Sequence, residues 1–510
     1  MRGVTVPTLL LLACAGAADA QAVSTAAATR FLEQATWGPT PASVAHLQAI
    51  GFTNWLDEQF VTAPSVISDV PPDANGREPM SPVQQQFFYN AVNGADQLRQ
   101  RVAFALGEIW VTSAVKLTTA DEVVPYLRLL ALDAFASYPT IARDVTLSPS
   151  MGHYLDMVNN DKANAATGHS ADENYAREVM QLFTIGLSEL NMDGTPQLSG
   201  GQPVPTYDQD SIEGMARVLT GWTYPLQPGA KQGSHNPPYF EGQMVAVEAN
   251  HDTGAKTFLG VTLPAGQTAE QDLSDALHAI LSHPNVAPFV SRQLIQHLVT
   301  GNPSGAYVQR VATVFKQSNG DMKTVITAIL LDPEARAGDD AEPAPGFGHL
   351  REPVLYMNGL LRGLGAEVAS SNSLPGQANT LGQNVYYPPT VFNYFSPKYS
   401  FNTGSGTAIT SVNSPEFQLL SGASAILRTS FVNTLVYGGI GGVTLDWTAL
   451  EALTPAQMVA AADQALLGGR LTAQDTAAIL SAVNAQTTAK AKAQAAVYLV
   501  ASSSQYQVER

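Results

Sequence analysis

The chain has 510 residues, enough for one large domain or two domains of ordinary size. Hydrophobic residues make up 45% and charged residues only 14%, which favours a packed globular protein and excludes wholesale disorder. With 26 basic and 43 acidic residues the net charge is −17, so we expect no nucleic-acid partner. The single cysteine, Cys14, excludes a disulfide framework, a zinc–cysteine site and an iron–sulfur cluster.

Residues 1–20 have the pattern of an export signal peptide. Arg2 precedes an apolar stretch that is too short to span a bilayer comfortably, and the run from Ala18 to Ala20 fits the small-x-small rule for cleavage. We therefore expect a periplasmic or extracellular protein. The residues before Cys14 also resemble a bacterial lipoprotein cleavage box, so lipidation of Cys14 is the alternative. No later segment is apolar for long enough to predict a membrane span.

Helical periodicity dominates the chain after the signal peptide. Thr40-Pro41 predicts a helix start, Gly51 predicts the end of that helix, and a further short helix follows from Thr53. Short strands are expected over 243–248 and 256–262. Further helices are predicted over 96–113, 121–137, 172–187, 208–222, 270–282, 285–300, 305–317, 321–331, 349–363, 415–428 and, as two or three helices, 449–501.

Residues 62–94 hold many Pro, Asn and Asp residues and are expected to form a long loop. Residues 364–414 are rich in Gly, Ser, Asn, Pro and aromatic residues and are expected to be irregular. The fold class that follows is mainly α: a large multi-helix domain with long irregular insertions and few short strands. We expect the main domain over 27–430 and a C-terminal helical extension over 431–510 that packs on it.

Several motifs of this chain are similar to those of the bacterial domain-of-unknown-function 1800 family. They include Arg351-Glu352-Pro353 and occur in the family's order, so the resemblance is specific across residues 28 to 428. The matching segments are 30–40, 101–106, 151–156, 173–186, 216–222, 251–252 with Lys256, 283–285, 351–353 and 388–393. The resemblance implies a secreted, mostly helical protein and implies no reaction. Members are often encoded beside a secreted protein of the domain-of-unknown-function 1501 family, which makes that protein a candidate partner.

The predicted helix 172–187 carries the first candidate site residues, Glu173, Arg177 and Glu178. On a helical wheel the two glutamates lie about 140° apart, so they cannot easily chelate one ion together. The structural interpretation is that Glu173 pairs with Arg177 and that Glu178 pairs with a distant arginine such as Arg217. The functional interpretation is that either glutamate is a general acid/base or one metal ligand.

His251 and Asp252 are the candidate partners of those glutamates, because they lie on a loop before a predicted strand. An imidazole beside a carboxylate could ligate a divalent metal or orient a proton transfer. In the structural interpretation the loop is held by hydrogen bonds and Lys256 forms an ion pair. Zinc, phosphate-binding and nucleophile-elbow motifs are absent from the sequence.

The segment 386–399 is dense in aromatic residues and would either stack on a glycan, grip a peptide, or seal the helical core. Two functions remain open. The favoured one is a non-catalytic envelope or secreted binding protein that acts with a separately encoded partner. The alternative is an exported, metal-assisted hydrolase-like enzyme that uses Glu173 or Glu178 with His251 and Asp252, while Arg177 or Arg217 holds an anionic substrate group.

Overall fold

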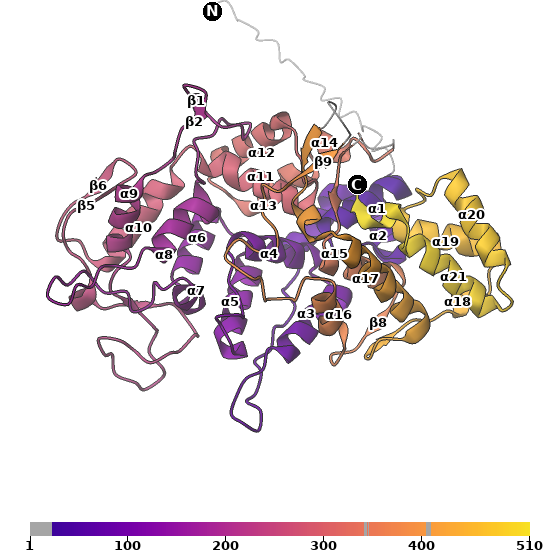
Figure 1. Cartoon of the computed structure of the whole chain (residues 1–510), viewed down its shortest axis with the longest axis horizontal. Coiled ribbons are helices and arrows are strands. Elements are labelled where there is room, and N and C mark those ends of the chain that lie inside the picture. The colour runs from indigo at the N-terminus through magenta and orange to yellow at the C-terminus, as the bar shows by residue number, and fades with distance from the viewer. Residues whose placement is uncertain (1–22, 341–343, 345, 404–409) are drawn as a thin grey trace, which may run out of the picture.

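A computed structural model of the protein describes residues 23–340, 344, 346–403 and 410–510. The predicted signal peptide and Cys14 lie outside these residues. Helices dominate the described chain and the strands form only short two-stranded pairs, so the prediction of a mainly α fold is confirmed (Figure 1). Within the described residues, no helix combines the length and the apolar character that crossing a membrane requires.

The first two thirds of the chain form a series of short and medium helices. Most begin at a Ser, Thr or Asp cap, as Thr40 does for α2, where its side chain accepts from the backbone N–H of Ser43. These elements are α1 (Thr25–Ala35), α2 (Pro41–Val61), α3 (Ser81–Asn93), α4 (Gln97–Ile109), α5 (Ala120–Asp133), α6 (Tyr138–Thr146), α7 (Pro149–Tyr154), α8 (Asn174–Glu178), the π-helix η1 (Val179–Thr184), α9 (Gln209–Val218), the 3₁₀ helix η2 (Glu248–Asn250), α10 (Ala269–Leu281), α11 (Val286–Leu298), α12 (Gly305–Gln317), α13 (Met322–Leu330) and α14 (Pro333–Arg336).

The last third adds a second group of helices. They are α15 (Pro353–Gly363), α16 (Leu374–Thr380), the 3₁₀ helix η4 (Pro415–Leu419), α17 (Gly422–Asn433), the π-helix η5 (Thr434–Gly438), α18 (Thr448–Glu451), α19 (Pro455–Leu467), α20 (Ala473–Asn484), α21 (Ala489–Ala501) and α22 (Ser504–Gln507). The predicted helix over 415–428 is therefore replaced by η4 and a separate α17.

The described residues also contain six short antiparallel strand pairs. They are β1 (Leu198–Ser199) with β2 (Gln202–Pro203), β3 (Trp222–Thr223) with β4 (Val245–Ala246), β5 (Lys256–Phe258) with β6 (Val261–Leu263), β7 (His349–Leu350) with β12 (Val508–Glu509), β8 (Glu367–Val368) with β11 (Val443–Thr444), and β9 (Ser400–Thr403) with β10 (Thr410–Asn413). The β7–β12 pair explains why the helix predicted from residue 349 begins only at Pro353.

Two helix predictions differ from the structure in an informative way. The helix expected to end at Gly51 continues as α2, but Gly51 itself is non-helical with φ of 79°, so the predicted break is present as a kink. The helix expected over 172–187 starts as α8 and widens into the π-helix η1, which ends before Gly186 at φ of 74°. A π-helix changes the angle per residue, so a wheel drawn at 100° fails beyond Glu178.

The buried side chains form two hydrophobic cores. The larger one takes residues between Ala28 and Ala335, and the second takes residues between Val354 and Tyr506 together with Trp37 and neighbours from α3. The predicted domain boundary at residue 430 lies inside the second core, because residues on both sides of it pack together there.

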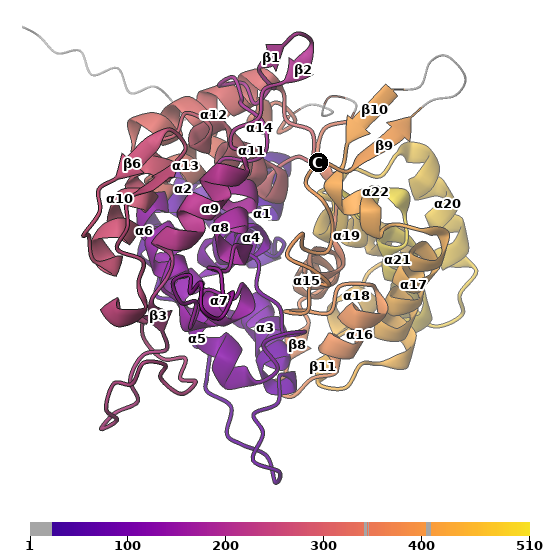
Figure 2. The same cartoon turned by 60° about the vertical axis from the view of Figure 1, so that its left-hand side comes forward.

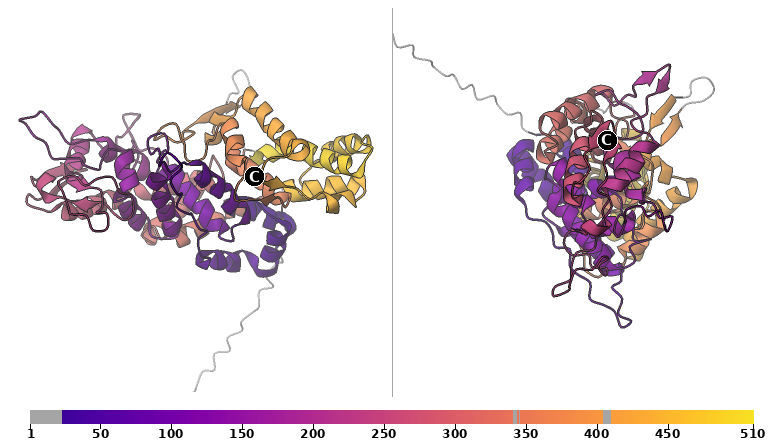
Figure 3. Two further views of the ribbon diagram at one scale, coloured as in Figure 1. Left: turned by 90° about the horizontal axis from the view of Figure 1, so that it is seen from below. Right: turned by 90° about the vertical axis from the view of Figure 1, so that its left-hand side faces the viewer.

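The two cores lie side by side along the molecule. Figure 2 shows α15 to α22 gathered on one side, with α1 to α14 on the other, and Figure 3 shows the elongated outline that results. The helix α4 belongs to the first core and α15 to the second, and both lie near the middle (Figure 1). The surface between these two cores is called the junction below.

Gly38 tests how closely the junction is packed. Its φ is 126°, and a Cβ at this position would lie 2.6 Å from the Cα of Gly359 in α15, a backbone atom that cannot move aside. We expect Gly38→Ala to lower the free energy of unfolding by about 3 kcal/mol, measured by chemical denaturation. Gly376→Ala is the control, since a Cβ there meets nothing within 4 Å. Equal stability of the two variants would contradict the close packing.

Candidate functional site

Charged side chains are buried at the junction, where the two hydrophobic cores meet. They come from seven parts of the chain, and all are almost fully excluded from solvent. They are Glu33 of α1, Arg101 and Glu108 of α4, His297 of α11, His349 of β7, Arg351 and Glu352 before α15, Glu416 of η4 and Glu509 of β12. We call these nine residues the junction cluster.

One half of the junction cluster consists of ion pairs. His349 lies between two carboxylates, with Nδ1 3.1 Å from Glu416 Oε1 and Nε2 3.4 Å from Glu509 Oε1. Burial alone would lower the pKa of His349, but the charges of Glu509 and Glu416 outweigh it and raise that pKa to about 10. Glu33 binds Arg351 at 2.7 Å and Arg470 at 3.1 Å. In each of these ion pairs, both charged groups are side chains of the protein.

Glu108 and Glu352 form the other half. Burial raises the pKa of Glu108 to about 7, although the nearby Glu352 and Asn393 side chains and the charge of Arg101 act in the opposite direction. Burial, followed by the charge of Glu108, raises the pKa of Glu352 well above its usual value. Gln383 donates a hydrogen bond to Glu352.

His297 lies behind Glu108 and is neutral. Its Nδ1 is 3.0 Å from Glu108 Oε2, but the geometry is not that of a hydrogen bond. Burial lowers the pKa of His297 to about 4, despite the opposing charges of Glu352 and Glu416. Neither carboxylate oxygen of Glu108 accepts a well-formed hydrogen bond, which is unusual for a buried carboxyl group.

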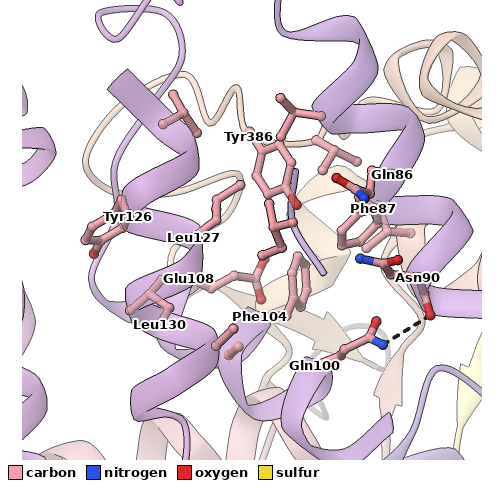
Figure 4. Close-up of a pocket in the computed structure, with 18 of the residues that line it drawn as sticks. Gln86, Phe87, Asn90, Gln100, Phe104, Glu108, Tyr126, Leu127, Leu130 and Tyr386 are labelled. Atoms are coloured by element: carbon pink, nitrogen blue, oxygen red, sulfur yellow. Dashed lines mark hydrogen bonds between the residues drawn. The ribbon is translucent and has the colours of Figure 1, made fainter. Parts of the chain in front are cut away.

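Glu108 also lines a cavity between helices, which we call the junction pocket (Figure 4). The pocket has a volume of about 130 Å³ and lies between α3, α4 and α5 and the coil before Asn393. Its walls include Phe87, Phe104 and Tyr386. Glu108 and Asn393 additionally line a smaller cavity of about 40 Å³ that contains His297. Glu108 therefore borders both cavities.

The coil that closes the junction pocket has a strained backbone. Tyr386 and Asn393 both adopt the left-handed region, with φ of 68° and 67°, which is uncommon for residues other than glycine. The backbone N–H of Ala114 donates to the carbonyl of Tyr386 at 2.8 Å, and Tyr394 donates to the carbonyl of Asn384. Of the predicted aromatic segment, Tyr386 packs inward at the junction, whereas Phe392 is 52% exposed.

The predicted site residues on α8 divide between two environments. Arg177 Nη2 lies 3.0 Å from Glu173 Oε2, so the ion pair expected between them is confirmed. Glu178 is buried, and burial raises its pKa against the nearby charge of Arg177. Its Oε2 has no hydrogen-bond partner. The expected pairing of Glu178 with Arg217 is wrong, because Arg217 binds another carboxylate.

That carboxylate is Asp252, whose Oδ2 lies 2.7 Å from Arg217 Nε and whose Oδ1 lies 3.1 Å from Nη2. This bidentate contact, together with a backbone N–H, lowers the pKa of Asp252 even though burial acts to raise it. Its neighbour His251 turns away from it and is fully buried. Adjacent positions in the sequence therefore place their side chains in separate polar contacts.

His251 uses both ring nitrogens within the protein. Nδ1 lies 2.9 Å from the carbonyl of Thr220, and Nε2 lies 2.9 Å from Asp272 Oδ2. Lys256 Nζ is 2.5 Å from the same Asp272 oxygen, so the expected ion pair of Lys256 is confirmed. Among the described residues, no three His, Cys, Asp or Glu side chains are grouped to hold a metal ion. The metal and acid–base roles of His251 and Asp252 stay predictions.

The chain belongs to the family described as "Protein of unknown function (DUF1800)", whose sequence model matches residues 30–508. The resemblance drawn from the motifs is therefore confirmed, and the match extends through the C-terminal helices. No curated protein and no solved structure matches the chain. Four of the resembling segments meet at the junction, because they contain Glu33, Arg101, Glu352 and Asn393.

Glu108 was not predicted from the sequence, and its buried state is directly testable. Its folded pKa is raised, so its contribution to stability is fully present below its unfolded pKa near 4.5 and is lost as pH rises through about 7. Glu108→Gln cannot ionise. We expect the variant to gain on the order of 2 kcal/mol over the wild type between pH 5 and pH 8, measured by chemical denaturation.

The control for this experiment is Glu213→Gln, which removes a charge from an exposed position of α9. Its effect should stay within about 0.5 kcal/mol at both pH values. If Glu108→Gln behaved like this control, Glu108 would not be held in a desolvated site.

Proposed function

We propose that this protein is an exported binding protein that takes an apolar part of a ligand into the junction pocket. The observation that carries the proposal is the pocket itself: aromatic and aliphatic side chains line much of it, and polar side chains, among them Arg99, Gln100 and Glu108, line the rest. Small-molecule sites are concave and mostly apolar, with a small number of polar groups that fix orientation. A carboxyl group with a strongly shifted pKa in such a cavity is a further sign of a functional site.

The size of the junction pocket indicates what part of a ligand it would hold. At about 130 Å³ it is close to the roughly 150 Å³ cavity that is known to accept benzene in another protein. One aromatic ring or a short branched alkyl group therefore fits. The strained backbone at Tyr386 and Asn393 supports the proposal, because strain of this kind is concentrated at ligand-binding and active sites.

Export is part of the proposal and rests on the N-terminal sequence. The first described helix, α1, begins at Thr25 and is capped by Ser24, whose side chain accepts from the N–H of Ala27. Cleavage after Ala20 would therefore leave every described helix intact. Intact-mass spectrometry of the mature protein should give a chain that begins at Gln21. A lipid-modified chain beginning at Cys14 would instead support the lipoprotein alternative, and an uncleaved chain would contradict both.

The resemblance also supplies the proposed partner, a secreted protein of the domain-of-unknown-function 1501 family. In this proposal the two proteins act on the same ligand outside the cytoplasm, and the junction pocket supplies the binding step.

Filling the junction pocket tests the binding proposal. Ala103 of α4 is half-buried and lines the pocket, so Ala103→Phe should occupy the space with its ring. We expect benzyl alcohol to bind the wild type at one site with a Kd on the order of 1 mM, measured by calorimetry, and to bind this variant at least tenfold more weakly.

Ala477→Phe is the matched control, because it makes the same change on the exposed surface of α20. It should leave binding of benzyl alcohol unchanged. If the wild type binds no benzyl alcohol, or if Ala103→Phe binds as the wild type does, the junction pocket is not the binding site.

A further inference from the structure

Glu108 brings a carboxyl group to the junction pocket, and the nearby Glu352 and Asn393 side chains and the charge of Arg101 only partly offset the cost of burying it. Glu108 is 8% exposed, and both of its carboxylate oxygens lack a well-formed hydrogen bond. Figure 4 shows its carboxyl group reaching into the space beside Phe104. A buried carboxylate in this situation is costly unless a proton or a cation neutralises it. Within the described chain, the carboxyl group of Glu108 therefore lacks a neutralising partner on the side that faces the junction pocket.

Among the described residues, the arginines nearest to Glu108 form no ion pair with its carboxyl group. Arg101 lies over the ring of Trp37 at 5.4 Å and donates to the carbonyl of His297, and it forms no ion pair with Glu108. Arg99 lines the pocket but lies over Phe135 at 4.6 Å and donates to the carbonyl of Ala131. Each guanidinium group thus donates to a backbone carbonyl, while Nε and Nη1 of Arg101 have no hydrogen-bond partner.

Aromatic rings surround the space in front of the Glu108 carboxyl group. The ring centroids of Phe87 and Phe104 are 6.0 Å apart, and those of Phe87 and Tyr386 are 5.8 Å apart. Aromatic faces attract cations, and this attraction grows when the cation is removed from water. Rings and a carboxylate together suit a positively charged group on an apolar body. They suit an anionic ligand poorly, because Glu108 would repel it.

We propose that the junction pocket selects ligands in which a protonated amine is attached to an aromatic or aliphatic body, and that Glu108 pairs with the amine. This inference rests on the proposed function and adds the ligand class to it. A neutral alcohol can donate one hydrogen bond to Glu108 but leaves its charge uncompensated. A protonated amine supplies both donors and the opposite charge.

Among the groups around the pocket end of Glu108, Glu108 itself is the one whose ionisation should change when such a ligand binds. His297 is neutral because its pKa is lowered to about 4, and burial raises the pKa of Glu352. Binding of a cation requires Glu108 as a carboxylate, so the affinity should rise with pH through about 7. The titratable and charged groups that face Glu108 from the packed elements are Arg101, His297, Glu352, Tyr394 and Glu416.

Three probes of one size test the proposal by calorimetry at pH 8: benzylamine, benzyl alcohol and benzoate. We expect benzylamine to bind at least tenfold more tightly than benzyl alcohol, and benzoate to bind most weakly. Glu108→Gln should bring the affinity for benzylamine down to that for benzyl alcohol. In the wild type, benzylamine should bind about tenfold more weakly at pH 5.5 than at pH 8, while benzyl alcohol should not change.

The outcomes separate this inference from the proposed function. If benzyl alcohol binds in the junction pocket and benzylamine binds no more tightly, the ligand class is wrong and the binding function stands. The inference is also overturned if benzylamine binds tightly but Glu108→Gln does not weaken it, because the amine then lies elsewhere. If none of the three probes binds, both proposals fail. The pH series uses the wild type alone, so it gives a result even if the variant does not fold.

Discussion

A carboxyl group that is buried between two hydrophobic cores has to be neutralised, and this constraint organises the junction. Nine charged or titratable side chains from seven parts of the chain meet there, and most satisfy one another. His349 balances Glu416 and Glu509, and Arg351 balances Glu33. Burial raises the pKa of Glu352, which favours its uncharged form. Glu108 lines the junction pocket, and neither of its carboxylate oxygens has a well-formed hydrogen bond, so the charge network is incomplete on the side of that pocket.

The same network ties the ends of the folded chain together. Glu33 lies in α1 and Glu509 lies in the terminal strand β12, which pairs with β7 next to His349. The C-terminal residues are therefore part of the junction, because β12 supplies Glu509 to the cluster. This agrees with a family match that runs to residue 508. Two cores joined by buried charge can also be sensitive to pH, since several members of the network have strongly shifted pKa values.

The sequence predicts the helices well because their signals are local. Caps such as Thr40, the break at Gly51 and the Glu173–Arg177 pair all depend on residues within one helical turn or its immediate neighbours, and each is present in the structure. The π-helix after Glu178 was missed because a regular helical wheel assumes constant geometry.

The junction cluster could not be predicted in the same way. Its members are separated by up to several hundred residues, and what brings them together is packing of the two cores. One local signal was available: Glu108 interrupts an otherwise apolar stretch from Ala103 to Trp110. A charged residue there would be expected to face either water or a polar site. Deciding between those environments requires the position of α15 and the coil before Asn393. The polar contacts of His251 likewise depend on Asp272, a residue that sequence reasoning did not connect with it.

The central claim is that Glu108 is a desolvated carboxyl group exposed to the interior of the junction pocket. Its titration can be followed by NMR of the side-chain carboxyl carbon in protein labelled at glutamate, with Glu108→Gln used to assign the signal. The account predicts a midpoint near 7 in the free protein and a lower midpoint when the pocket is saturated with benzylamine. A midpoint near 4.5 that does not respond to benzylamine would contradict it.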